Sequence, residues 1–133
     1  MKNRVTGIGG IFFRVADPKA STAWYVQHLG LTPEAWGGSV FNWRSFDNPE
    51  QKATTVWSPF PRDTAYFGDS GQQYMINYRV ENLDELLTQL QAEGVWIDEK
   101  RENSDYGRFA WIKDGDGNRI ELWEPPKNDS DCS

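Results

Sequence analysis

The segment GDGNRIELWEPP, residues 115–126, joins a tight turn to a strand near the end of the chain. In the overlapping run KDGDGN, the Asp-Gly and Gly-Asn pairs supply the positive φ angles that hairpin turns need. Alternate residues of a strand face opposite sides of its sheet. One side of this strand is expected to carry Arg119, Glu121 and Trp123, and the other Ile120 and Leu122. Glu121 is thus a carboxylate placed among apolar neighbours.

A strand followed by a capped helix begins each half of the chain. Residues 10–15, GIFFRV, favour a strand, and Asp17-Pro18 is typical of an N-cap followed by proline at the first helical position. That helix is expected to end at Gly30 and to share one face among Ala20, Ala23, Trp24 and Leu29. Residues 74–80, YMINYRV, predict a strand, and Asn82 caps a helix with the buried stripe Leu83, Leu86, Leu87 and Leu90.

The remainder of each half is predicted to be β-structure. Residues 37–46 and 52–58 predict a strand pair, and three further strands are expected at 95–101, 107–113 and 118–124. The proline- and glycine-containing run at 58–73 favours a linker, with a lid or an inter-chain hinge as the alternatives. We therefore predict one domain at 1–126, divided into module one (8–58), a linker (59–73) and module two (74–125), followed by a flexible tail at 127–133.

The two halves match as an internal repeat with a period of about 65 residues. Arg14-Val15 before the first helix corresponds to Arg79-Val80 before the second. Val56-Trp57-Ser58-Pro59 corresponds to Leu122-Trp123-Glu124-Pro125. Each half is interpreted as a βαβββ module. In this register Thr55 is the counterpart of Glu121, and Gly10 is the counterpart of Met75.

Charge and composition exclude several classes of partner. The chain has 14 basic and 20 acidic residues and a formal net charge of −6, without a basic run, which argues against nucleic acid and anionic membranes as partners. No apolar stretch approaches the roughly 18 residues of a spanning helix, and the N-terminus lacks a secretory h-region. The single cysteine, Cys132, permits no intrachain disulfide, which fits a cytoplasmic location.

Two βαβββ modules, a helix beginning at Asp-Pro and the ending DGDGNRIEL, residues 114–122, resemble the vicinal oxygen chelate superfamily. This group includes glyoxalase I, fosfomycin resistance proteins, extradiol dioxygenases and bleomycin resistance proteins. The resemblance covers residues 8–125 and implies an α+β fold in which the modules form a curled, barrel-like mixed sheet around a cavity. It also implies a homodimer.

The resemblance places the usual metal-ligand positions on Gly10, Thr55, Met75 and Glu121. Glycine has no side chain, threonine is a poor neutral ligand, and methionine is too soft for the hard divalent ions involved. About three protein ligands is the minimum for a catalytic metal. The only histidine, His28, falls in the first helix. We therefore predict that the standard metal site is absent and that no cofactor is bound, with a divalent metal as the disfavoured alternative.

Strand alternation predicts which side chains line the cavity. The expected lining is aromatic with a few polar groups: Phe12, Arg14, Thr55, Trp57, Met75, Asn77, Arg79, Arg119, Glu121 and Trp123. Trp111 joins them because fosfomycin-resistance-like members carry an active-site aromatic residue there. The tryptophans can equally serve as barrel filling. Arg14 and Arg79 can also lie solvated at the sheet edge, or pair with Glu121 and replace the metal site structurally.

Two main classes of function follow. The first is a binding protein that holds a small organic molecule in an aromatic cavity without a metal. The sequence does not decide whether this ligand is a cation or an anion. The acidic chain and the tryptophan faces suit a cation, whereas Arg14 and Arg79 suit an anion. The second is a lyase, isomerase or dioxygenase-type enzyme that uses Glu121 as metal ligand or general base. A third, weaker alternative is a structural dimer. The run GIGG at 7–10 precedes a strand and does not form a phosphate loop.

Overall fold

The computed structural model describes residues 4–126, so the predicted tail at 127–133 lies outside the described residues. Seven strands form one mixed sheet in the order β2-β3-β1-β4-β7-β6-β5. The strands are β1 (Gly7–Val15), β2 (Ser39–Arg44), β3 (Lys52–Pro61), β4 (Tyr74–Arg79), β5 (Ile97–Ser104), β6 (Gly107–Lys113) and β7 (Arg119–Glu124). The helices are α1 (Pro18–Leu29) and α2 (Leu83–Ala92). This arrangement confirms the predicted α+β fold.

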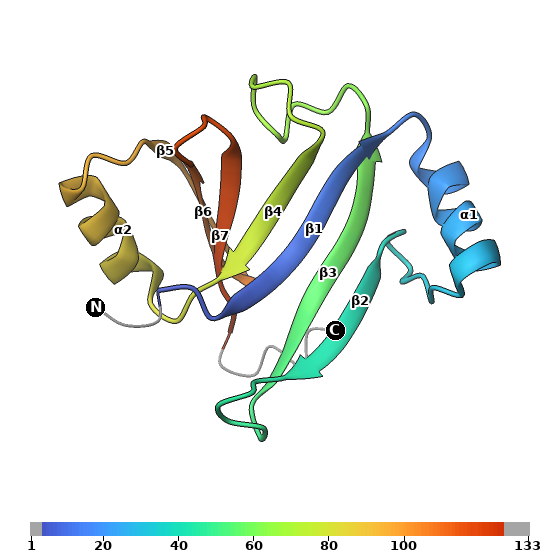
Figure 1. The fold of residues 1–133 in the computed structure, drawn as a ribbon, viewed down its shortest axis with the longest axis horizontal. Helices are drawn as coiled ribbons and strands as arrows, with labels where there is room; N and C mark the ends of the chain where they lie inside the picture. Colours follow the sequence, from blue (N-terminus) through green and yellow to red (C-terminus); the bar gives the residue numbers. More distant parts are fainter. Residues whose placement is uncertain (1–3, 127–133) are drawn as a thin grey trace.

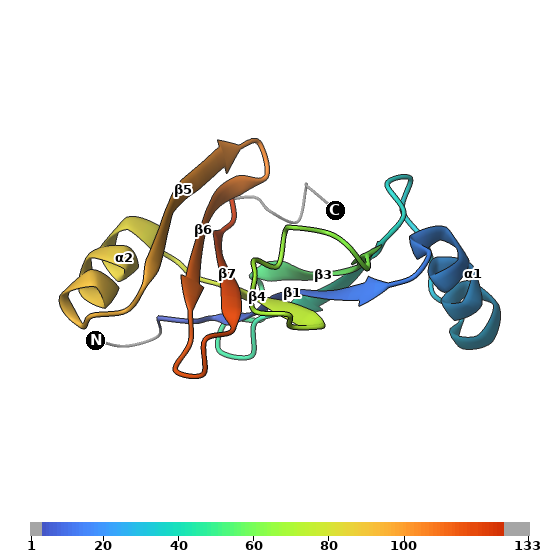
Figure 2. The same ribbon diagram turned by 90° about the horizontal axis from the view of Figure 1, so that it is seen from above.

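The sheet is strongly curled, and the two helices lie at its opposite ends (Figure 1). Figure 2 shows β5, β6 and β7 standing up from the part of the sheet that contains β1, β3 and β4. The halves join through antiparallel pairing of β1 with β4, in which Phe12 lies opposite Met75. Both modules of the sheet therefore come from one chain. No helix within residues 4–126 is long and apolar enough to span a bilayer.

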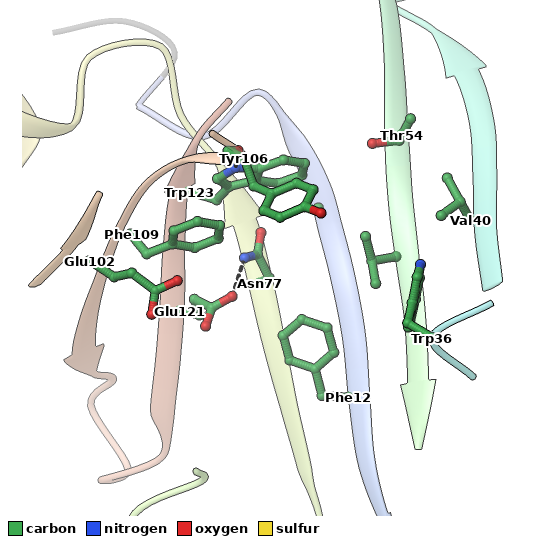
Figure 3. A pocket seen from close by; sticks show the side chains of 12 residues that line it. Phe12, Trp36, Val40, Thr54, Asn77, Glu102, Tyr106, Phe109, Glu121 and Trp123 are labelled. Carbon is green, nitrogen blue, oxygen red and sulfur yellow. Dashed lines mark hydrogen bonds between the residues drawn. The ribbon is translucent and has the colours of Figure 1, made fainter. Parts of the chain in front are cut away.

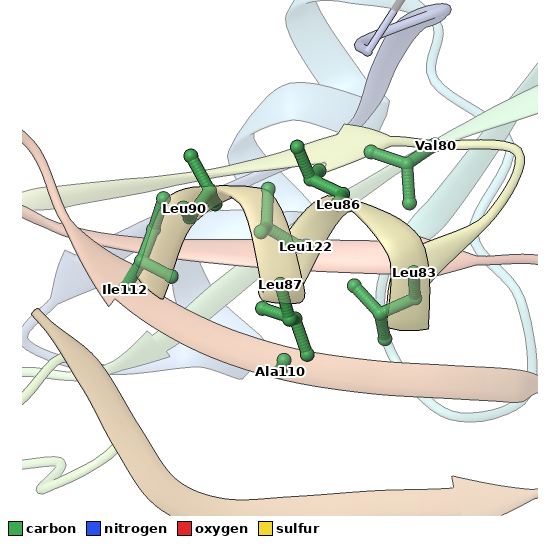
Figure 4. Packing of buried hydrophobic residues seen from close by; sticks show 8 residues of the cluster. All are labelled: Val80, Leu83, Leu86, Leu87, Leu90, Ala110, Ile112 and Leu122. Carbon is green, nitrogen blue, oxygen red and sulfur yellow. The ribbon is translucent and has the colours of Figure 1, made fainter. Parts of the chain in front are cut away.

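The main apolar core lies between α2 and the second half of the sheet (Figure 4). The Asn82 side chain accepts a hydrogen bond from the Glu85 amide at 3.1 Å and begins the helix as predicted. The predicted stripe of leucines is buried, and it packs on Val80, Ala110, Ile112 and Leu122. The leucines recur with helical spacing, so they form one continuous apolar face.

Helix α1 has the predicted ends but packs only weakly on the sheet. Asp17 caps its N-terminus, and Gly30 ends it with a φ of 71°. However, no residue of α1 is buried, and Trp24 and Leu29 are 52% and 62% exposed. The contact with the sheet is made mainly by Tyr25, whose ring lies 4.9 Å from that of Trp57. The face expected to carry Ala20, Ala23, Trp24 and Leu29 is therefore exposed, since apolar residues with weak periodicity do not fix one buried face.

The first half contributes three strands rather than the four of a βαβββ module. Residues 30–38 form turns, in which the Glu34 amide donates to the Gly38 carbonyl at 2.7 Å and the Gly37 amide donates to the Glu34 carbonyl at 2.9 Å. Backbone groups that satisfy one another locally are not available to a further strand. The second half has the predicted βαβββ order.

Strand β3 extends to Pro61, three residues beyond its predicted end. Its pairing with β2 ends at Trp57, whereas its parallel pairing with β1 continues to Pro61. Pro59 and Pro61 lack N–H groups but lie where one side of β3 is an open edge, and prolines are tolerated at such edges. The connection between the modules therefore begins at residue 62.

Candidate functional site

A cavity of about 390 Å³ opens on the concave side of the curled sheet. One wall comes from β1, β2 and β3, and the facing wall from β4, β5, β6 and β7 (Figure 3). Most of the residues that line it are apolar or aromatic: Gly9, Phe12, Trp36, Val40, Thr54, Val56, Asn77, Glu102, Tyr106, Phe109, Glu121 and Trp123. Organic ligands are bound in concave sites of this kind, with apolar walls and a few polar groups.

Glu121 is the polar centre of this cavity and is only 2% exposed. Asn77 donates a hydrogen bond from Nδ2 to Glu121 Oε1 at 2.6 Å. Trp111 donates from Nε1 to Glu121 Oε2 at 3.0 Å, and the Tyr66 hydroxyl donates to the same oxygen. Three side chains thus hold one buried carboxylate, as burial of a charged group requires.

Strand pairing places two of these donors beside Glu121. Asn77 on β4 lies opposite Glu121 in parallel pairing, and Trp111 on β6 lies opposite it in antiparallel pairing. Tyr66 comes from the connection at 62–73, which arches over the concave side (Figure 2). The Tyr66 ring stacks on Phe60 at 5.3 Å with an interplanar angle of 9°. The connection therefore contributes a residue to the site and is more than a spacer.

Burial sets the protonation of this cluster. It raises the pKa of Glu121, and the nearby Glu102 carboxylate acts in the same direction, whereas the hydrogen bonds from Tyr66, Asn77 and Trp111 oppose the shift. Burial also raises the pKa of the Tyr66 hydroxyl, and the charge of Glu121 adds to that effect. The phenol proton therefore stays on Tyr66, which acts as a donor to the carboxylate.

The other end of the Asn77 amide is buried without a partner. Asn77 Oδ1 accepts no hydrogen bond within the described part of the chain. Figure 3 shows Nδ2 facing Glu121 and the amide oxygen turned toward Tyr106 and Trp123. A buried acceptor left unsatisfied costs about 1–3 kcal/mol. This oxygen is therefore an unsatisfied acceptor enclosed behind the cavity wall, against Gly9.

Arg14 and Arg79 do not pair with Glu121, and neither lines the cavity. The Arg14 guanidinium donates to the carbonyls of Arg62, Thr64 and Gln72, so it fixes the connection between the modules. Arg79 donates from Nη1 to the Thr54 carbonyl at 3.2 Å, and its guanidinium lies over the rings of Trp43 and Trp123. The proposed arginine replacement of the metal site is wrong. Tyr66, Asn77 and Trp111 surround the carboxylate instead.

Two other predicted residues lie next to the cavity rather than in its lining. Met75 is 1% exposed and packs with Phe12, Phe67 and Trp111 in a second apolar cluster. Arg119 forms an ion pair with Asp98 at 2.9 Å, and its guanidinium lies over the Trp111 ring at 5.6 Å. The predicted residues Phe12, Asn77, Glu121 and Trp123 are in the lining itself.

The predicted orientation of β3 is wrong by one residue. Thr54 and Val56 line the cavity, whereas Thr55 and Trp57 face the opposite side. The Thr55 hydroxyl donates to the Ile8 carbonyl at 2.6 Å and accepts from Trp43 Nε1 at 2.8 Å. The repeat in the sequence and the strand pairing therefore give different inward-facing residues on β3.

Strand pairing also changes the counterpart of Glu121. In the second half Asn77 pairs with Glu121, and in the first half Phe12, which is the repeat counterpart of Asn77, pairs with Ser58. Ser58 rather than Thr55 is therefore the position equivalent to Glu121. Serine carries a neutral hydroxyl, which is a poor metal ligand like that of threonine. The first half therefore still supplies no strong metal ligand at the position equivalent to Glu121.

Several lining residues were not predicted from the sequence: Gly9, Trp36, Val40, Thr54, Val56, Glu102, Tyr106 and Phe109. Thr54 and Val56 were missed because the alternate residues of β3, Thr55 and Trp57, were expected to face the cavity. Tyr106 belongs to the turn before β6, and the structure places it in the lining. Tyr66 lies in the segment for which a lid is the alternative to a linker, but no local pattern there indicates a contact with Glu121.

The residues at the usual metal positions do not fit a divalent ion. Both oxygens of Glu121 already accept hydrogen bonds, and Gly10 offers no side chain. Ser58 and Met75 complete a set that is poor in the oxygen and nitrogen ligands that such ions need. Within residues 4–126, no group of three His, Cys, Asp or Glu side chains is placed to hold a metal.

Comparison with known families finds one match over most of the chain. The model of the Glyoxalase/Bleomycin resistance protein/Dioxygenase superfamily matches residues 7–122. Comparison with curated proteins gives no match.

Solved structures share the fold at low sequence identity. Methylmalonyl-CoA epimerase from Mycobacterium tuberculosis is 22% identical, with a TM-score of 0.61 over 95% of this chain and 92% of that one. A variant of Streptomyces coelicolor methylmalonyl-CoA epimerase in complex with 2-nitronate-propionyl-CoA is 16% identical, with a TM-score of 0.67 over 91% and 98%. An NAD-dependent benzaldehyde dehydrogenase from Legionella pneumophila is 15% identical, with a TM-score of 0.54 over 88% and 98%. These likenesses concern the fold alone.

Proposed function

The chain belongs to the Glyoxalase/Bleomycin resistance protein/Dioxygenase superfamily, and from this premise we propose that it binds a small organic molecule in the aromatic cavity without a divalent metal. The observation that carries this proposal is the hydrogen-bonded state of Glu121. Tyr66, Asn77 and Trp111 occupy both oxygens of the carboxylate, at the position where the family's metal ligand is expected.

The cavity walls support binding of an organic molecule. The aromatic rings of Trp36, Tyr106, Phe109 and Trp123 contribute to the lining, and aromatic walls suit flat or apolar ligands. The volume of about 390 Å³ falls within the range of small-molecule sites. A protein of this kind sequesters or senses its ligand by binding alone.

Metal content and ligand binding test the proposal together. Purified, tag-free protein grown with zinc, iron, manganese and nickel is analysed by mass spectrometry, before and after chelation. We expect far less than one metal per chain and unchanged binding of small aromatic probes after chelation. Stoichiometric metal that is lost together with probe binding contradicts the metal-independent function.

A second candidate is an enzyme that transfers a proton through Glu121. Burial raises the pKa of this carboxylate above its ordinary value, which makes the carboxylate a stronger base. Epimerases are among the proteins that share this fold. A metal-dependent lyase, isomerase or dioxygenase-type reaction would instead require Glu121 to exchange its hydrogen-bond donors for an ion. Turnover that is lost in Glu121→Gln while binding persists would favour the proton-transfer enzyme.

The homodimer and the cytoplasmic location expected from the sequence stay predictions. Sedimentation equilibrium at several protein concentrations tests the first of them. A mass of twice 15.3 kDa supports the dimer, and a mass of 15.3 kDa contradicts it.

A further inference from the structure

The charged side chains that line the cavity are both acidic. Glu102 and Glu121 contribute carboxylates, and among the described residues of the lining there is no lysine, arginine or histidine. Glu102 lies on β5 and faces the region between Glu121 and Phe109 (Figure 3). Glu102 pairs with Phe109 across β5 and β6, so both side chains lie on the cavity face of the sheet.

The nearby cations do not offer their N–H groups to this space. Arg14 is engaged by three backbone carbonyls. Arg79 is 4% exposed and lies beneath Trp43 and Trp123, with a hydrogen bond to the Thr54 carbonyl. Lys100 and Arg119 lie over the ring of Trp111, outside the lining. The sequence left the charge of the ligand open, because Arg14 and Arg79 were expected in the cavity. Since neither arginine lines it, the acidic side chains determine the charge of the cavity.

The hydrogen bond to Glu121 fixes the orientation of the Asn77 amide. Its Nδ2 group is committed to Glu121 Oε1, so rotation of the amide by 180° would bring Oδ1 against a carboxylate oxygen. Oδ1 therefore points away from Glu121 and has no partner in residues 4–126. It lies against Gly9 with almost no accessible surface, so it contributes an unpaired negative dipole beside the cavity rather than a direct ligand contact.

The walls complete a site for a positively charged group. Phe109 and Trp123 stack with their ring centroids 6.0 Å apart, and Phe12 lies on the other side of Asn77 (Figure 3). Aromatic faces attract organic cations, and the attraction grows when water is excluded. Acidic groups and aromatic faces thus converge on one volume, with the unpaired oxygen of Asn77 behind its wall.

We infer that the cavity selects an organic cation that carries N–H donors, such as an amidinium or guanidinium attached to an aromatic or apolar body. The N–H groups bond the Glu102 carboxylate, the positive charge is balanced by Glu102 and Glu121, and the body of the ligand packs on the aromatic walls. This inference rests on the proposed binding function and names its ligand class.

Three probes of closely similar size test the inference on the full-length protein. Phenylguanidine is a cation, phenylurea is its neutral isostere, and phenylacetate is an anion. Each is titrated into ¹⁵N-labelled protein, and binding is followed through the Asn77 side-chain amide and the Gly9 backbone amide. These signals report the cavity directly, because Gly9 and Asn77 both line it. We expect phenylguanidine to bind at least about tenfold more tightly than phenylurea, and phenylacetate to bind most weakly.

Two variants with the same change in net charge sharpen the test. Glu102→Gln removes a carboxylate from the lining, whereas Glu99→Gln removes one from an exposed position on the same strand outside the lining. We expect Glu102→Gln to weaken phenylguanidine binding about threefold to tenfold and to leave phenylurea binding nearly unchanged. The Glu99→Gln protein should bind both probes as the wild type does.

The outcomes separate this inference from the function on which it rests. Equal or tighter binding of phenylurea or phenylacetate at the Asn77 and Gly9 signals overturns the cationic ligand class and leaves the binding function standing. Equal losses in Glu102→Gln and Glu99→Gln also overturn it, because they indicate only a long-range effect of net charge. Failure of all three probes to move these signals overturns the ligand class and the binding function together.

Discussion

Tyr66, in the connection between the two modules, donates its hydroxyl hydrogen bond to Glu121, on the last strand of the sheet. The two residues are 55 positions apart in the chain. Through this contact the connection closes one side of the carboxylate, while the sheet supplies Asn77 and Trp111 on the others. The carboxylate that the sequence resemblance places at a metal-ligand position is thus enclosed by protein donors.

Tyr66→Phe tests the importance of this contact for stability. The change keeps the ring that stacks on Phe60 but removes the hydroxyl donor, leaving Oε2 of Glu121 with the Trp111 bond alone. We expect the free energy of unfolding to fall by about 1–3 kcal/mol, because a buried carboxylate loses a hydrogen bond. Urea denaturation at neutral pH measures the change.

Tyr106→Phe is the matched control for that variant. Tyr106 is 63% exposed, and its hydroxyl is not one of the three donors that bond Glu121. Removal of an exposed hydroxyl should change stability by no more than about 0.5 kcal/mol. Equal effects of the two substitutions would show that the Tyr66 hydroxyl contributes nothing specific.

The free energy of unfolding should depend on pH partly through the raised pKa of Glu121. Burial raises its pKa above the ordinary value of 4.5, so the folded protein binds this proton more tightly than the unfolded chain does. The resulting stabilisation is fully present below the ordinary pKa and is lost as pH rises through the folded pKa. We expect the unfolding free energy of the wild type to decline relative to that of Glu121→Gln over this interval.

Denaturation of both proteins at intervals from acid to neutral pH measures this difference. Subtraction is needed because Asp84, Asp98 and Asp114 have lowered pKa values, caused first by hydrogen bonds, and contribute stability with the opposite pH dependence. These groups are common to both proteins. A difference that stays flat between acid and neutral pH, or that grows with pH, contradicts a raised pKa for Glu121.

The second half of the fold was predictable because its local patterns agree with its tertiary contacts. The leucine stripe of α2, its Asn82 cap and the turn before β7 all form as the sequence indicates. The first half was less predictable: α1 has clear caps, but its apolar residues do not select a buried face. Thr55 and Trp57 were misplaced because an error of one residue in β3 moves every side chain to the other face.

The site combines predictable and unpredictable residues for a physical reason. Asn77, Trp111 and Glu121 lie on paired strands, so alternation along the chain brings them together. Tyr66 lies in a segment without regular structure, and its contact depends on how that segment crosses the sheet. Periodicity carries no information about such a contact.

Gly9 lies where neighbouring side chains leave no room for a Cβ atom. A Cβ atom at this position would lie 2.2 Å from Asn77 Oδ1, 2.8 Å from Trp123 Cε3 and 2.9 Å from Arg79 Cγ. We expect Gly9→Ala to destabilise the protein by about 1–3 kcal/mol and to weaken probe binding, because these side chains must move. The GIGG run therefore provides room for neighbouring side chains rather than a phosphate site.

Gly115→Ala controls for the general effect of adding a methyl group at a glycine. No atom lies within 4 Å of its Cβ position, and its φ angle is not in the left-handed region. Thermal and urea denaturation should show little change for Gly115→Ala. Similar stability and binding in Gly9→Ala and wild type would contradict the close packing at Gly9.

The unequal packing of the two helices predicts unequal costs of truncation. Leu87 on α2 is 7% exposed within the main core, whereas Leu29 on α1 is 62% exposed. Leu87→Ala should lower the free energy of unfolding by about 2–5 kcal/mol, because it removes buried methyl groups and leaves a cavity. Leu29→Ala should change it by no more than about 0.5 kcal/mol, since its side chain already contacts water. Urea denaturation at low protein concentration measures both variants, and a large loss from Leu29→Ala alone would show that α1 is covered in solution, most simply by a second copy of the chain.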